Sequence, residues 1–261
     1  MIHLTLVFFA LIALLFILWS SVYLGRRYGV RQLQKHAKKK LEVVGVAEGS
    51  VFGLLGLLIA FTFSGAYERY ESRKLHILEE ANIFDTAYEM IDFAPKKYQP
   101  ALRHDVREYL DLHLASYRDL PSVWLVEQDM YKAIAVQHRI WNTVVTANET
   151  DPNHGLTQLV VPAMSKMFSA FHSGINMSLV HPPPIVFFLL VGLASLGGFL
   201  VGYNVAESQQ KHPVHVLCYI LLTAFIIYLI LNLEYPRIGF VRLATFDQML
   251  VDVREDMNYT N

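Results

Sequence analysis

Four long apolar segments constrain this chain more than any other feature. Residues 4–25 and 185–206 each run for 22 residues without a charged side chain, and residues 214–233 run for 20. The remaining segment, residues 51–66, is the second along the chain; it holds 16 residues and extends backwards past Glu48 to Val43. A helix needs about 20 apolar residues to cross the hydrocarbon core of a bilayer. The segments therefore predict an all-α, polytopic membrane protein with four transmembrane helices in a 2+2 arrangement.

A cleaved signal peptide is the alternative for residues 4–25. It needs a basic start and a small-residue cleavage site. Arg26 and Arg27 stand where that cleavage site should lie, so we interpret the segment as a retained membrane helix.

Composition agrees with a membrane protein and excludes several other classes. Hydrophobic residues make up 54% of the 261 residues and charged residues 17%, with a formal net charge of -1. A nucleic-acid partner is not expected, because such proteins carry a strong basic excess. The single cysteine, Cys218, can form neither an internal disulfide nor a cysteine-rich zinc site.

The spacing of the segments divides the chain into four parts. Residues 1–66 hold the first two membrane helices, 67–183 a helical extramembrane domain, 184–233 the last two membrane helices, and 234–261 an amphipathic C-terminal tail. The loop after the first helix is rich in Arg and Lys between Arg26 and Lys40. The positive-inside bias puts this loop in the cytoplasm and the helical domain on the other side, by a small margin.

A long helix is predicted between Lys40 and Phe93, where the sequence contains no proline. Every seventh residue from Gly49 gives Gly56, Phe63, Tyr70, Ile77, Phe84 and Ile91. This is the pattern of a packed helix with a 3.5-residue period. It predicts one helix of about 43 residues, about 65 Å long at 1.5 Å per residue.

Small residues mark the membrane part of this helix and the third membrane segment. They let helix backbones approach closely in lipid. In the second segment they are Gly45, Gly49, Gly53, Gly56 and Ala60, and in the third Ala194, Gly198 and Gly202. Packing inside one four-helix bundle is the favoured interpretation, and self-association about a symmetry axis is the alternative.

Catalytic and metal motifs are absent from the sequence. It contains no phosphate-binding glycine loop and no nucleophile elbow, and Ser195 lies in an apolar helix without a nearby base. His104, Glu108 and His113 have no metal-motif spacing, so we interpret them as a solvated or salt-bridged face. We expect no enzyme, no cofactor and no metal.

The stretch from Phe61 to Asn82 resembles a bacterial family described as bestrophin-like. The residues that carry this resemblance follow a glycine-rich second membrane helix and include one in the tail: Tyr67, Glu68, Arg69, Arg73, Glu80 and Pro236. The 2+2 layout is similar along nearly the whole chain.

This resemblance implies kinship to bestrophins, which are pentameric anion channels whose second helix lines a narrow apolar neck. Aligning the aromatic, basic end of that helix on Arg69 and Tyr70 puts neck positions at Gly53, Leu57 and Phe61. Bestrophins hold their middle domain in the cytoplasm, which is opposite to the charge count above. The resemblance thus implies an oligomeric channel in a bacterial inner membrane, in contact with lipid, its own copies and a small anion. The alternative is a non-conducting membrane scaffold whose helical domain binds a partner.

Overall fold

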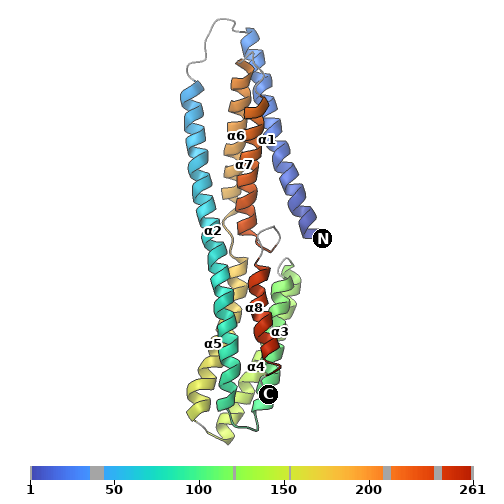
Figure 1. Ribbon diagram of the computed structural model, residues 1–261, viewed down its shortest axis with the longest axis vertical. Coiled ribbons are helices and arrows are strands. Elements are labelled where there is room, and N and C mark those ends of the chain that lie inside the picture. The colour runs from blue at the N-terminus through green and yellow to red at the C-terminus, as the bar shows by residue number, and fades with distance from the viewer. Residues whose placement is uncertain are drawn as a thin grey trace. The chain divides into compact units, whose positions relative to one another are not determined.

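The computed structural model describes residues 2–35, 44–119, 122–152, 154–207, 213–237 and 243–259 (Figure 1). No strand occurs among these residues, so the predicted all-α class is confirmed. Within the described ranges, four helices are long and apolar enough to cross a membrane, as the apolar segments predicted: Phe8–Gln34, Glu48–Phe93, Pro184–Ala206 and Val214–Glu234.

The described helices, in chain order, are α1 (Ile2–Lys35), α2 (Val44–Met90), α3 (Gln99–Asp119), α4 (Val123–Thr150), α5 (Val161–Leu179), α6 (Pro184–Glu207), α7 (Pro213–Glu234) and α8 (Ala244–Asp256). A short 3-10 helix, Ile91–Phe93, ends α2, and one π-helical turn, Leu156–Val160, precedes α5.

Backbone contacts divide the chain into two units. The first, which we call the membrane unit, comprises Met1–Tyr70 and His181–Val241, and the second, the helical unit, comprises Glu71–Val180 and Arg242–Asn261. The C-terminal helix α8 thus packs within the helical unit. Arg254 holds it there, because its Nε and Nη2 donate to the Asp111 carboxylate of α3 at 2.8 and 2.9 Å.

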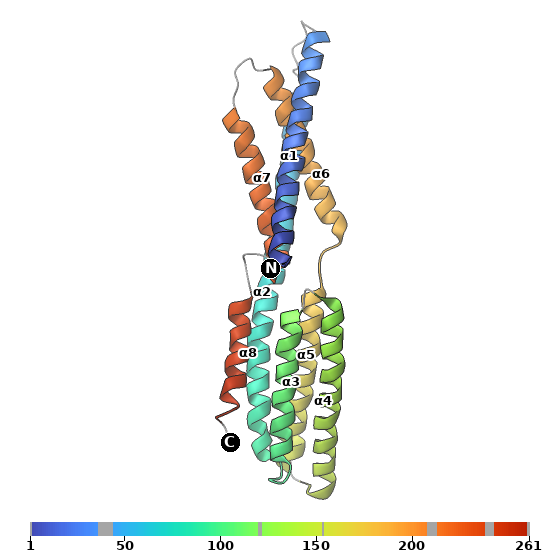
Figure 2. The same ribbon diagram turned by 90° about the vertical axis from the view of Figure 1, so that its right-hand side faces the viewer.

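The membrane unit is built around a close pair of helices, α1 and α6 (Figure 2). A Cβ atom added to Gly202 of α6 would lie 2.0 Å from the carbonyl oxygen of Val22, and one added to Gly25 of α1 would lie 1.9 Å from that of Phe199. Only glycine permits this approach of two backbones. Helices α2 and α7 join the same apolar core through residues such as Leu55, Ala66, Ile220 and Ile227.

The helical unit has an aromatic core between α2, α3 and α5. Phe84 and Tyr88 of α2, Tyr109 of α3 and Phe171 of α5 are all buried, and the Tyr109 and Phe171 rings lie 4.9 Å apart. The hydroxyl of Tyr88 donates to the carbonyl of Met257 at 2.8 Å, which fixes the end of the C-terminal segment.

Helix α2 is continuous over 47 residues, which confirms a single long helix slightly longer than the seven-residue row implied. Its burial, however, follows a 3.6-residue period. A seven-residue row drifts by about 20° per heptad on a straight helix, or about 120° from Gly49 to Ile91. The outer members of the row, Ile77 and Phe84, are therefore buried, whereas Gly49, Gly56 and Phe63 are exposed.

Candidate pore-lining face

Helix α2 exposes a continuous face within the membrane unit. Leu57 and Phe61 are 55% and 69% exposed, and Gly53 one turn earlier is also exposed. The opposite side of the same helix is buried through Leu55 and Ala66. The expected neck positions therefore share one face of α2, and that face is not covered by the chain's own helices.

The residues on this face are unlike those that the other membrane helices expose. Outward residues of α1, α6 and α7 are bulky and apolar, as lipid contact requires, and include Phe16, Trp19, Phe188, Leu222 and Phe225. The exposed face of α2 mixes bulky residues such as Leu54 and Phe63 with a run of small ones: Gly49, Ser50, Gly53, Gly56, Ala60 and Ser64. A helix face that meets only lipid has no need of small residues, which in membranes serve close contact between helices.

The glycines of α2 and α6 lie in different surroundings. A Cβ added to Gly49, Gly53 or Gly56 would meet no described atom within 4 Å. Ala194 and Gly202 of α6 are buried, and a Cβ on Gly198 would lie 3.4 Å from Val22 and Tyr219 side chains. Gly45 lies in α2, at a position whose side-chain surroundings are outside the described residues. Gly198 and Gly202 of α6 thus pack within the chain, whereas Gly49, Gly53 and Gly56 of α2 leave a surface open.

The end of the exposed face carries an aromatic and an acidic residue. Tyr67 is 52% exposed, and its ring stacks on Phe63 at a centroid distance of 6.4 Å. Glu68 is exposed as well. These two residues of the bestrophin-like stretch therefore lie on the open side of α2.

Arg69 turns to the other side of α2 and pairs with Glu234 of α7. Its Nη2 lies 2.7 Å and its Nε 2.8 Å from Oε2 of Glu234, whose side chain is fully buried. Nδ1 of His181 lies 3.1 Å from the other carboxylate oxygen, and the His181 ring packs on Tyr235 at 4.4 Å. Pro236, the tail residue of the resemblance, is also buried, and it directly follows Tyr235 in the sequence.

The two remaining residues of the resemblance lie in the helical unit. Arg73 is buried, and its Nη2 donates to the carbonyl of Val180 at 2.8 Å. Glu80 is fully buried, accepts a hydrogen bond from the Tyr117 hydroxyl at 2.6 Å, and lies 3.2 Å from Nε2 of His113. A Cβ on Gly174 would come within 2.0 Å of Glu80 Oε1, so a glycine there makes room for the carboxylate.

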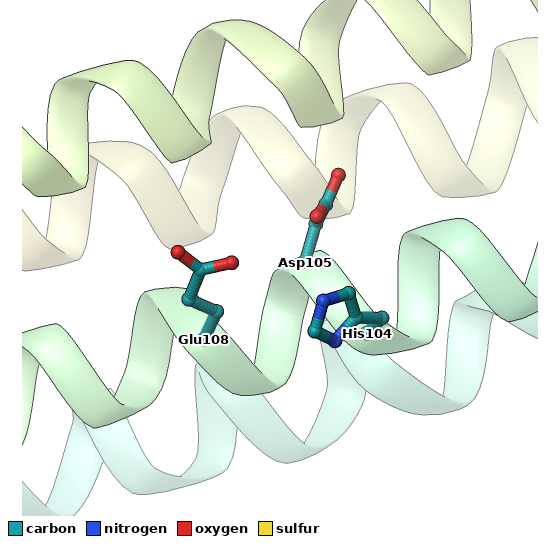
Figure 3. Close-up of side chains that lie close together, drawn as sticks. All are labelled: His104, Asp105 and Glu108. Carbon is teal, nitrogen blue, oxygen red and sulfur yellow. The ribbon is translucent and has the colours of Figure 1, made fainter.

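One other group could be taken for a metal site. His104, Asp105 and Glu108 of α3 place one ligand atom each within 4.8 Å of one another (Figure 3). Arg139 of α4 already occupies this place, because its guanidinium donates to Asp105 at 3.0 Å and also to Glu108. The hydrogen bond to Asp105, with a further one to Glu108, raises the pKa of Arg139. The group is therefore a salt-bridged face. Both of its carboxylates already bind Arg139, so neither is free to bind a divalent metal ion.

The sequence did not single out Glu234, His181 or Gly174. Glu234 is the first charged residue after the fourth apolar segment, and such a residue at a helix end commonly faces water. Its burial depends on Arg69, which lies 165 residues earlier, and no local pattern connects the two.

The helices and the exposed face define a multi-pass, helical membrane protein. The bestrophin-like domain family matches residues 12–245, so the chain belongs to the bestrophin-like family. A search of curated proteins finds no match.

Solved structures with the same fold come from a bacterial bestrophin homolog of Klebsiella pneumoniae. A crystal structure of that homolog solved by Zn-SAD phasing is 14% identical, with a TM-score of 0.66, over 94% of this chain and 98% of that one. A mutant form of the homolog is 13% identical, with a TM-score of 0.69, over 94% and 99%. At this level of sequence identity the similarity shows a shared fold and nothing further.

Proposed function

We propose that the chain assembles with its own copies into an ion channel of a bacterial inner membrane, with α2 facing the symmetry axis. The observation that carries this proposal is the open face of α2, built from small residues beside Leu57 and Phe61. The most apolar window of α2 is also the least covered of the four, at 17% buried against 22–28% for the others. A second copy across an axis would cover part of this surface, and a pore would account for the rest.

Leu57 and Phe61 would form the constriction. Their side chains project from one face one turn apart, so each copy would contribute two apolar levels. Narrow apolar constrictions gate by losing their water. Gly53 adds no side chain at the next level, which makes the neck wider there.

The number of copies and the ion follow from the family resemblance. Kinship to bestrophins favours a pentamer and a small anion as the permeant species. The charge that the α2 face itself carries is negative, through Glu68.

Planar-bilayer recording of the purified protein tests the channel. Leu57→Ala should raise unitary conductance or open probability, because it removes bulk from the constriction. Leu217→Ala is the matched control: this α7 leucine is 56% exposed, beside other bulky residues of a lipid-like face, and its truncation should leave conductance unchanged. A protein that assembles in the bilayer but never conducts, with or without Leu57→Ala, overturns the proposal.

A non-conducting scaffold is the second candidate, and helix α4 favours it. Trp124, Tyr131 and Trp141 are 64%, 67% and 40% exposed on this helix of the helical unit. Exposed Trp and Tyr residues are typical of protein-binding surfaces. A channel and a scaffold differ in conductance, so the same recordings separate them.

A further inference from the structure

We infer that Glu68 makes this pathway select cations over anions. The inference rests on the proposed channel and concerns which ions pass through it. It follows from the side of α2 on which each charged residue lies.

The face that holds the neck positions continues to Glu68. Gly53, Leu57, Phe61, Ser64 and Glu68 are spaced by four, four, three and four residues and are all exposed. At 3.6 residues per turn they fall within about 80° of the helix circumference. A copy that presents Leu57 and Phe61 to the axis therefore presents Glu68 to the axis as well, about two turns beyond the neck.

The adjacent cation is turned away from this face. Arg69 lies about 100° further round the helix. Its guanidinium is engaged by Glu234 at 2.7 Å, within its own chain. The buried carboxylate of Glu234 neutralises Arg69, the arginine next to Glu68, which would otherwise add an anion-attracting charge at this level of α2.

The Glu68 carboxylate is not neutralised in the same way. No described side chain forms a hydrogen bond or an ion pair with it. The next cation along α2 after Arg73, Lys74, forms an ion pair with Glu71. In a symmetric assembly each copy adds one such carboxylate at the same level, which produces a ring of negative charge.

The rest of the membrane part of α2 carries no opposing charge. Between Lys40 and Arg69 every charged residue is acidic: Glu42, Glu48 and Glu68. Glu48 accepts a hydrogen bond from Asn204, and Glu42 lies outside the described residues. Rings of Asp or Glu favour cations and rings of Arg or Lys favour anions. The charge along α2 therefore indicates a cation pathway, in contrast to the anion that the family resemblance implies.

Reversal potentials in a potassium chloride gradient test this inference. The wild-type protein should pass potassium over chloride with a permeability ratio well above one. Glu68→Gln should lower that ratio several-fold, and Glu68→Lys should bring it below one. Glu127→Gln is the matched control, because Glu127 is an exposed carboxylate on α4, and it should leave the ratio unchanged.

A crosslinking measurement checks the axial position of Glu68 independently of conductance. In a Cys218→Ser background, Glu68→Cys should crosslink between copies on oxidation, and Glu127→Cys should not. Conductance with a chloride preference, a ratio that Glu68→Gln and Glu68→Lys leave unchanged, or conductance without crosslinking at position 68 overturns this inference alone. Absence of any conductance overturns the proposed channel and this inference with it.

Discussion

Arg69 and Glu234 join the second and fourth membrane helices at a distance of 2.7 Å between Nη2 and Oε2. The Glu234 side chain is fully buried, whereas that of Arg69 is 32% exposed. The pair is therefore asymmetric: removal of Arg69 would take a cationic partner from a buried carboxylate, which His181 also contacts.

Arg69→Gln should destabilise the membrane unit by about 3–5 kcal/mol, because it removes one partner of a buried charge pair. Glu234→Gln should cost less, because the freed Arg69 is partly exposed to water. Unfolding in a graded series of denaturing detergent measures both. Arg118→Gln, at an exposed position of α3, is the control. Equal losses for Arg69→Gln and Glu234→Gln would contradict the asymmetry.

The contact of α1 with α6 depends on the absence of a side chain at Gly202. Gly202→Ala should force the backbones apart, since its Cβ would lie 2.0 Å from the Val22 carbonyl oxygen. Overpacking of this kind typically costs about 1–3 kcal/mol. Gly192→Ala, on the same helix with open space at its Cβ, should be neutral or slightly stabilising. Thermal unfolding in detergent compares them, and similar melting temperatures for the two variants would refute the close contact.

The buried carboxylate of Glu80 depends on the Tyr117 hydroxyl. Tyr117→Phe should cost about 1.5–3 kcal/mol, because it removes a 2.6 Å hydrogen bond to a buried acid without changing the volume of the ring. Tyr259→Phe, at a residue that is 85% exposed, should have no effect. Chemical unfolding of the full-length protein, followed by circular dichroism, measures the difference. A neutral Tyr117→Phe would mean that another group supplies this hydrogen bond.

Tyr109 should make the helical unit sensitive to alkali. Burial raises the pKa of the Tyr109 phenol, so the folded state favours its neutral form. The unfolded phenol ionises near pH 10. The stability that depends on neutral Tyr109 is therefore fully present below pH of about 10 and is lost as pH rises above it. The free energy of unfolding of Tyr109→Phe should therefore fall less steeply with rising pH than that of the wild type. Tyr259→Phe should behave like the wild type.

Much of the fold follows from composition along the chain. The four membrane helices were predicted because a long uncharged segment has few alternatives in water or lipid. The continuous α2 was predicted because no proline interrupts it between Lys40 and Phe93. Both predictions depend on local properties of the sequence.

The facing of α2 was harder to predict. The small residues of α2 and α6 have the same four-residue spacing, yet Gly202 contacts another backbone and Gly53 contacts nothing described. A glycine pattern indicates that another helix can approach closely. Which helix does so depends on segments that are distant in sequence. The seven-residue row had the same weakness, because a small error in period grows to a third of a turn over six heptads.

The single cysteine, Cys218, provides a labelling site on each subunit. Cys218 is exposed on α7, within the membrane unit, and no other residue of the chain carries a thiol. A fluorophore attached there would mark each subunit once. The number of photobleaching steps from a single assembled particle would then give the subunit stoichiometry directly, without any substitution in the protein.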